Sequence, residues 1–218
     1  HRDLHLSLRR QRQMCIRDST GGMGSYSPPS FWTSDLATKI RDNIIVPTIS
    51  ALRKEGSIYK GVLYSGIILT KTGPKVLEFN CRLGDPETQV ILPLLLSDLT
   101  EVFSSIAEGN LNKTNIKWSE DSSVGVVMAS SGYPSTYPIG LPISGLDAID
   151  LNGLVFHGGT DTIDDPNPRV VTNGGRVLTV VGTGKQLIEA KHRAYENLSL
   201  IHISSPRDLS TSRMPSSA

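Results

Sequence analysis

The sequence predicts an α+β protein made of two units, and three observations indicate this. First, the chain has 218 residues, 38% of them hydrophobic and 20% charged, which is enough for one large core or two small ones. Second, stretches with apolar residues at helical spacing alternate with short β-rich runs bounded by turn residues. Third, the polar segment 110–122 separates two groups of such elements, and we place a domain boundary there. No apolar run approaches the roughly 20 residues of a membrane helix, so we expect no membrane-spanning segment.

The first unit is predicted to begin with a long amphipathic helix. Ser34 or Asp35 is its cap, Pro47 is placed to kink it, and Gly56 ends it. Its apolar stripe follows multiples of four and consists of Leu36, Ile40, Ile44 and Leu52. This helix is interpreted as scaffold.

A hairpin and a second helix are predicted to complete the first unit. Residues 59–69 and 75–82 are β-rich and flank a turn at 71–74. Asp98, followed by Glu101, fits a capping box that opens a helix closed by Gly109.

The second unit is predicted to be small, with its strands first and a helix last. Strands are expected at 124–129 and 154–157. A hairpin around Asn173-Gly174-Gly175 is expected to pair residues 169–172 with 176–181. The closing helix is expected at 186–198, where apolar residues recur at helical spacing.

The two ends of the chain differ from the middle in composition. Residues 1–18 hold five arginines against two aspartates, and 201–218 form a Ser-rich tail, whereas residues 19–200 carry a small negative net charge. The acidic middle argues against a nucleic-acid partner, although a basic arm at 1–18 is an alternative. Both ends resemble translated adapter sequence, and we interpret them as non-native or disordered segments. With two cysteines that make an unlikely pair and no secretory signal, the sequence favours a reducing, cytoplasmic location.

The most informative stretch is the strand that leads into Gly84-Asp85-Pro86-Glu87. Because alternate residues of a strand share a face, Glu78, Asn80 and Arg82 are expected on one side. The other side is expected to face the core with Leu77, Phe79, Cys81 and Leu83. A carboxylate and an amide oxygen one strand repeat apart suit Mg²⁺, and an arginine beside them would offset charge on a transferring phosphoryl group. The alternative is an amphipathic strand whose polar face is merely hydrated.

Two neighbouring segments are further candidates. Asp85 and Glu87 could hold an amine or ribose hydroxyls, or they could instead favour the start of a following helix. Thr20-Gly21-Gly22-Met23-Gly24 is neither a Walker A loop nor a dinucleotide fingerprint, but successive glycines can expose several backbone N–H groups to a phosphate. An ordinary turn is the alternative for this segment.

Several strings, taken in order, carry a family resemblance over about residues 19–200. They are TGGMGSYSP, LYSGIILTKTGPKVLEFNCRLGDPETQVILPLL, VVMASSGYP, VFHGGT and VTNGGRVLTVVGTG. They resemble the C-terminal half of phosphoribosylamine-glycine ligases, and EFNCRLGDPETQ is the most specific of them. The resemblance implies the C-terminal part of an ATP-grasp domain at 19–115, followed by a small α+β C-terminal domain at 116–200.

The resemblance also implies an activity and roles for particular residues. Such ligases activate glycine with ATP and join it to 5-phosphoribosylamine in purine synthesis, and eukaryotic members are commonly fused to aminoimidazole ribonucleotide synthetase. The family places Mg²⁺ or Mn²⁺ at the positions matching Glu78 and Asn80. By analogy, Arg82 is expected on the phosphoryl or carboxylate group and Asp85 and Glu87 near phosphoribosylamine. The segment expected against substrate phosphate is Gly21, Gly22, Met23 and Gly24.

One departure from the family pattern limits what the chain can do. Thr20-Gly21-Gly22 appears almost at the start, before the parts that hold adenine and triphosphate in such ligases. We therefore expect this chain to be a fragment that is inactive alone. Other readings are a different ATP-grasp ligase or biotin-dependent carboxylase, a nucleic-acid-binding module that uses residues 1–18, and a structural remnant without catalysis.

Overall fold

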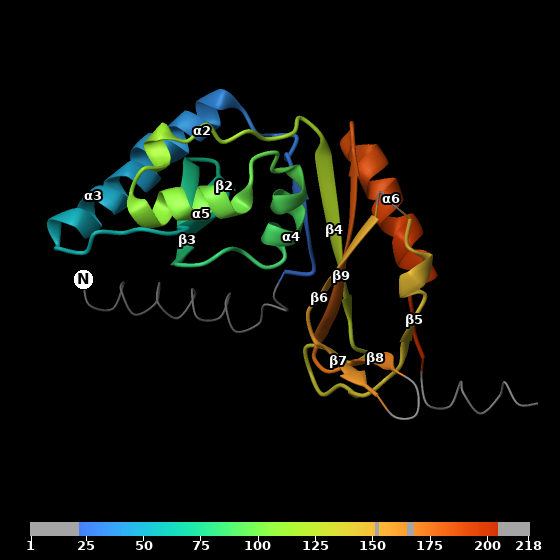
Figure 1. The fold of residues 1–218 in the computed structure, drawn as a ribbon. Coiled ribbons are helices and arrows are strands. Elements are labelled where there is room, and N and C mark those ends of the chain that lie inside the picture. Colours follow the sequence, from blue (N-terminus) through green and yellow to red (C-terminus); the bar gives the residue numbers. More distant parts are fainter. Residues whose placement is uncertain (1–21, 151–152, 165–167, 205–218) are drawn as a thin grey trace, which may run out of the picture. The chain divides into compact units, whose positions relative to one another are not determined.

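The computed structural model describes residues 22–150, 153–164 and 168–204. The expectations for residues 1–18, for Gly21 and for the 205–218 part of the tail therefore lie outside the described residues. The start of the tail expected at 201–218 is wrong as a disordered segment, because Ile201 is buried and His202–Ile203 form a strand. The chain divides into two units. The described parts of the first are Pro28–Thr88 and Leu94–Ser119, and those of the second are residues 22–27, Gln89–Pro93, 120–150, 153–164 and 168–204. The elements mix helices with antiparallel sheets, so the predicted α+β class is confirmed (Figure 1).

The first unit begins with a helical segment in three parts. Helix α2 (Ser34–Ile40) is followed by one π-helical turn (Arg41–Ile45) and by α3 (Val46–Lys54). The helix begins one residue earlier than expected, because the Thr33 hydroxyl accepts from the Leu36 N–H and acts as the cap. Pro47 lies near the start of α3, where its missing N–H costs little, and the break from regular helix precedes it.

The rest of the first unit follows the sequence expectations with shifted ends. Strands β2 (Tyr64–Thr70) and β3 (Gly73–Asn80) form an antiparallel two-stranded sheet. The short helix α4 (Glu87–Ile91) runs from the first unit into the second, and it is followed by a 3₁₀ turn (Leu92–Leu94). Helix α5 (Leu99–Glu108) is capped by Asp98 and closed by Gly109 at φ 77°, as predicted.

A four-stranded antiparallel sheet forms the centre of the second unit. Its order is β1 (Gly24–Ser27), β4 (Ser122–Ala129), β9 (Arg176–Gly184) and β6 (Gly153–His157). The long central strand β9 is almost wholly buried, and its Val177, Leu178 and Val180 join Ile143 and Ile201 in the core. Burial of this strand on both of its faces explains why β9 reads as a nearly continuous apolar run.

Two small sheets accompany this centre. Strand β5 (Ile143–Ser144) pairs with β10 (His202–Ile203), and β7 (Thr160–Ile163) pairs with β8 (Arg169–Thr172). The predicted hairpin between 169–172 and 176–181 is therefore wrong, since β8 pairs back to β7 while β9 pairs with β4 and β6. Gly159 and Gly174 pack so closely that a Cβ on Gly159 would lie 2.6 Å from Gly174 Cα. Because neither residue has a side chain, the backbone segments at Gly159 and Gly174 can approach each other this closely.

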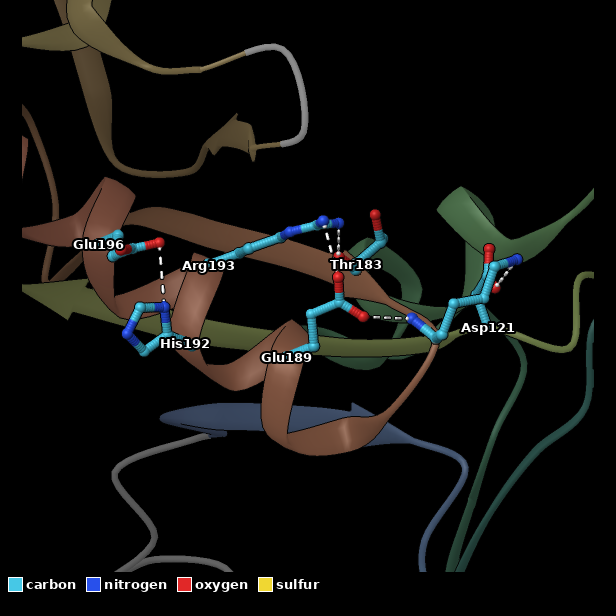
Figure 2. A network of polar contacts seen from close by, with 7 residues as sticks. Asp121, Thr183, Glu189, His192, Arg193 and Glu196 are labelled. Carbon is cyan, nitrogen blue, oxygen red and sulfur yellow. Dashed lines mark hydrogen bonds and ion pairs between the residues drawn. The ribbon is translucent and has the colours of Figure 1, made fainter.

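Helix α6 (Leu187–Leu200) packs on β9 and β4, and a polar network fixes its first turns (Figure 2). Glu189 accepts from the Lys185 backbone N–H over 2.8 Å and pairs with Arg193 over 2.8 Å. Arg193 Nη1 also donates to the Thr183 carbonyl over 2.7 Å, which ties the helix to the end of β9. Lys185 Nζ reaches Asp121 over 2.7 Å. Among the described helices, none combines the length and the apolar character needed to cross a bilayer.

Candidate functional site

The register of the β2–β3 hairpin places the candidate residues. Glu78 pairs with Gly66 and Asn80 pairs with Tyr64, so these four residues share one face of the sheet. Gly66 leaves room for the acid opposite it, because a Cβ at this position would lie 3.2 Å from Glu78 Cγ. A register shift follows Gly66, where Ile67 pairs with Val76. This shift is a β-bulge or similar irregularity, and such features change the direction in which nearby side chains point. It adjoins Glu78.

Glu78 and Asn80 contact each other directly. Asn80 Nδ2 donates to Glu78 Oε1 over 2.9 Å. Carboxylate and amide oxygens are the ligands that Mg²⁺ prefers, and the ion often takes only one or two from protein while substrate phosphates and waters complete its shell. The donor set therefore fits a divalent metal, provided that the amide rotates to present its oxygen. Among the described residues, no group of three or more acidic, histidine or cysteine side chains gathers at metal-binding spacing.

Arg82 lies beyond the end of the strand whose alternation was expected to place it. Strand β3 ends at Asn80, two residues earlier than expected, and Arg82 lies in the bend that follows. Its Nη1 donates to the adjacent Leu83 carbonyl over 2.9 Å, and the side chain is exposed. The guanidinium is thus near the site in sequence, but strand geometry does not hold it there.

The opposite face of β3 is not buried, which corrects a second expectation. Leu77, Phe79 and Leu83 keep 49%, 40% and 37% of their surface exposed, and the Cys81 thiol is free and exposed. The reason is that β3 pairs only with β2 in the described part of the chain, and a two-stranded sheet covers little surface by itself.

The turn after β3 leads to Glu87, whose side chain contacts the β2–β3 hairpin. Gly84 and Pro86 are buried, Asp85 is exposed, and the Asp85-Pro86 peptide bond is cis. Glu87 then begins α4, and its Oε1 accepts from the Tyr64 hydroxyl over 3.0 Å. The structure thereby joins Glu78, Asn80 and Glu87 around one tyrosine. Sequence reasoning missed Tyr64, and the signal that could have found it was its place opposite Asn80 in the predicted hairpin.

The environment of Tyr64 keeps its hydroxyl protonated. Partial burial, the hydrogen bond to Glu87 and the charges of Glu87 and Glu78 together raise the pKa of Tyr64 to about 12, while the charge of Arg82 acts in the opposite direction. Burial and the two carboxylates favour the neutral phenol, because a phenolate would be poorly solvated and would meet negative charges at close range. Tyr64 is therefore a hydrogen-bond donor throughout the physiological range.

An apolar cavity borders this tyrosine. Its volume is about 820 Å³, and its lining is mainly aromatic and aliphatic. The lining includes Phe31 and Trp32 just before α2, Leu36 and Ile40 of α2, and Ile67 of β2. The Tyr64 ring lies in this lining while its hydroxyl reaches Glu87.

The glycine-rich segment belongs to the second unit. Gly22 and Met23 lead into β1, where Gly24 pairs with Val126 of β4, so Gly24 lies in a strand, while Thr20 and Gly21 lie outside the described residues. Met23 O accepts from the Val127 N–H over 3.0 Å. Arg176 Nη1 donates to Gly22 O over 3.2 Å, a contact that sequence reasoning did not foresee. The described glycine positions thus lie in a different unit from Glu78, Asn80, Arg82, Asp85 and Glu87.

Two family models match the chain. Residues 16–88 match the phosphoribosylglycinamide synthetase ATP-grasp (A) domain, and residues 123–207 match the phosphoribosylglycinamide synthetase C domain.

Curated relatives and solved structures point the same way. A trifunctional purine biosynthetic protein adenosine-3 from Gallus gallus is 53% identical over 186 residues, which are 84% of this chain and 18% of that protein. A phosphoribosylamine-glycine ligase from Escherichia coli (strain K12) is 46% identical over 186 residues, 84% of this chain and 43% of the relative. The crystal structure of a phosphoribosylamine-glycine ligase from Thermotoga maritima matches with a TM-score of 0.74 at 36% identity, covering 85% of this chain and 45% of that one.

A more distant structure shares the fold. The N5-carboxyaminoimidazole ribonucleotide synthetase from Thermotoga maritima has a TM-score of 0.56 at 17% identity, over 84% of this chain and 46% of that chain. The present chain spans less than half the length of the bacterial ligases that it matches. The two family models, the relatives and the solved ligase agree with the resemblance found in the sequence, and the chain belongs to the phosphoribosylglycinamide synthetase family.

Proposed function

We propose that this chain is part of a ligase that joins glycine to 5-phosphoribosylamine at the expense of ATP. The observation that carries the proposal is the contact between Glu78 and Asn80 beside Glu87, in a chain of this family. A hard-oxygen pair suits nucleotide phosphates with their metal, and a separate carboxylate suits an amine substrate. We further propose that residues 19–115 belong to the ATP-grasp part and 116–200 to the C-terminal domain.

The reaction has two steps. A carboxylate oxygen of glycine attacks the γ-phosphorus of ATP and ADP leaves, which gives glycyl phosphate. The amine of 5-phosphoribosylamine then attacks the acyl carbon, inorganic phosphate leaves, and the amine loses a proton. Most of the catalysis in such transfers comes from positioning and from charge stabilisation.

Glu78 and Asn80 would hold the divalent ion, Mg²⁺ or Mn²⁺. The ion supplies positive charge to phosphate oxygens when it is bound. The strand register sets both side chains on the same face of β3, where Asn80 donates to the Glu78 carboxylate. The shared face lowers the entropy lost on binding, and the Asn80 amide has only to rotate to present its oxygen.

The remaining candidate residues are assigned roles toward the substrates. Arg82 would approach the transferring phosphoryl or the glycine carboxylate, which requires it to leave the Leu83 carbonyl. Asp85 and Glu87 would accept from the amine or the ribose hydroxyls of phosphoribosylamine. Gly21, Gly22, Met23 and Gly24 would face substrate phosphate through their backbone. We also propose a cytoplasmic location, because the exposed Cys81 thiol is free and a reducing compartment maintains such thiols.

The test uses a hybrid ligase in which residues 22–204 of this chain replace the matching part of the Escherichia coli relative. We expect ADP release that requires both glycine and 5-phosphoribosylamine. Glu78→Ala should abolish it, whereas Glu101→Ala, at an exposed position in the first turn of α5, should not. ADP release that is indifferent to glycine, or that needs another carboxylate, would contradict the proposal in favour of a different ATP-grasp ligase.

A second measurement addresses the metal directly in the 218-residue chain. Mn²⁺ titration followed by electron paramagnetic resonance should detect a site that weakens at least about tenfold in Glu78→Ala and Asn80→Ala. Equal binding by the Glu101→Ala control and by wild type is expected. Unchanged Mn²⁺ binding in both site variants would rule out the metal assignment.

A further inference from the structure

We propose that Tyr64 is a positioning residue that fixes the Glu87 carboxylate beside the Glu78–Asn80 pair and thereby sets the affinity for 5-phosphoribosylamine. The inference rests on the proposed function for the role of Glu87. It adds a residue that has no part in the roles assigned above. It also adds a physical link between the metal-binding face and the amine-binding carboxylate.

The first support is the position of Tyr64 between the two groups. Tyr64 lies directly opposite Asn80 in the β2–β3 ladder, so their side chains leave the same face of the sheet with their Cβ atoms about 5 Å apart. Its hydroxyl meets Glu87 Oε1 at 3.0 Å, although Glu87 belongs to the turn 23 residues further along the chain. One rigid ring thus spans the distance from the strand to α4.

The second support is that Glu87 is confined from the other side as well. A Cβ added to Gly84 would lie 2.5 Å from Glu87 Oε2 and 3.0 Å from Glu87 Cβ. The carboxylate therefore rests on the bare backbone of Gly84 while its other oxygen accepts from Tyr64. Contacts at both oxygens select one orientation, and a hydrogen bond to a charged group is among the stronger ones in proteins.

The third support is the direction of the hydrogen bond, in which the Tyr64 hydroxyl donates to Glu87 Oε1. The neutral phenol can only donate to a carboxylate, since an ionised carboxylate has no proton to give. The direction of the bond is therefore fixed, and the remaining lone pairs of Glu87 are left to accept from an amine or from ribose hydroxyls.

A consequence for substrate affinity follows. Without the tyrosine hydroxyl, Glu87 would sample several rotamers, and binding would have to restrict them again. That cost falls on the substrate that Glu87 contacts. The affinities for ATP and glycine, which depend on other groups, should change little.

The experiment compares Tyr64→Phe with Tyr59→Phe in the hybrid ligase. Tyr59 is the control because its hydroxyl also donates within the same unit, to the Val62 carbonyl over 2.7 Å, and its other neighbour is the Cys81 thiol, not Glu87. Tyr64→Phe should raise the KM for 5-phosphoribosylamine about tenfold, and change the KM for ATP and for glycine less than about twofold. Tyr59→Phe should leave all three within about twofold of the parent hybrid.

A double-mutant cycle separates this inference from the function on which it rests. If Tyr64 acts through Glu87, Tyr64→Phe should add little to Glu87→Gln. Loss of activity in Glu87→Gln with a normal Tyr64→Phe would overturn the positioning role and leave the proposed function intact. A normal Glu87→Gln would instead remove the assigned role of Glu87, and the inference with it.

A spectroscopic measurement on the 218-residue chain needs no turnover. With ¹³C-labelled tyrosine, the Tyr64 Cζ resonance should shift in Glu87→Gln and in Gly84→Ala, which displaces Glu87 without touching the tyrosine. Glu101→Gln should leave it in place. A Tyr64 resonance that is indifferent to both changes would show that the hydroxyl does not hold Glu87, and the inference would fail.

Discussion

The side-chain amide of Asn80 donates to the carboxylate of Glu78, two residues earlier on β3, over 2.9 Å. The bond joins a neutral donor to an anion, so replacement of the amide by a second carboxylate would set two like charges at this distance. Asn80→Asp should therefore lower the melting temperature at neutral pH, and divalent cations should restore it by offsetting the charge. Differential scanning fluorimetry with and without Mn²⁺ measures both effects. The same response to Mn²⁺ in wild type and variant would contradict the prediction.

Tyr64 should titrate about two units above an ordinary tyrosine. Its pKa is raised to about 12 from 10.0, so the stability that this group contributes is complete below pH 10 and is lost as pH rises through 12. The difference in tyrosinate absorbance between wild type and Tyr64→Phe gives the titration curve. Glu87→Gln should move the midpoint downward, since it removes the neighbouring charge. A midpoint near 10 in the wild type would be inconsistent with the contact.

The acid sensitivity of α5 should depend on its cap. Asp98 accepts from the backbone N–H groups of Glu101 and Thr100, and these bonds lower the pKa of its carboxyl group. Its contribution is therefore present above pH 3.8 and is lost as pH falls through the lowered folded value. Asp98→Asn keeps a capping side chain without a titrating group, so stability should vary less with pH between 4 and 2 than in wild type. Thermal unfolding followed by circular dichroism across this range is the measurement, and parallel pH curves would refute it.

Arg193 should contribute more to the stability of the second unit than its charge alone suggests. It bonds both the Thr183 carbonyl and Glu189, and its side chain is about one-third exposed. Arg193→Met keeps much of the aliphatic stem and should lower the free energy of unfolding by about 1–2 kcal/mol. The neighbouring pair of His192 and Glu196 is the control, because both partners are well exposed (Figure 2). His192→Gln should stay within about 0.5 kcal/mol by urea denaturation, and an equal loss in both variants would argue against the prediction.

The sequence predicted best where local chemistry decides the structure. The Asp98 cap and the Gly109 stop are both local signals, and α5 has both ends where they were predicted. The periodicity of α6 likewise places it correctly, with Ala190 and Ala194 buried against the sheet. Prediction was weaker where the outcome depends on which strand is the partner. The Asn173-Gly174-Gly175 signal is typical of a hairpin, but β8 pairs with β7 instead.

In the candidate site, too, the residues that depend on local geometry were predicted and those that depend on contacts between elements were not. Alternation along a strand correctly placed Glu78 and Asn80 on one face, because it depends only on backbone geometry. Alternation could not tell that β3 ends before Arg82, nor that the opposite face lacks a covering layer in the described structure. Tyr64 escaped notice because its role comes from a contact across two elements, which spacing along one element does not contain.

Strand β1 sits at the edge of the second unit's sheet although about a hundred residues separate it from its neighbour β4. If residues 120–204 were expressed alone, β4 would become an edge strand. Its unpaired backbone N–H and C=O groups could then pair with strands of other molecules. To avoid this aggregation, a protein made of residues 120–204 would also need Gly24–Ser27, either joined by a linker or added as a separate peptide.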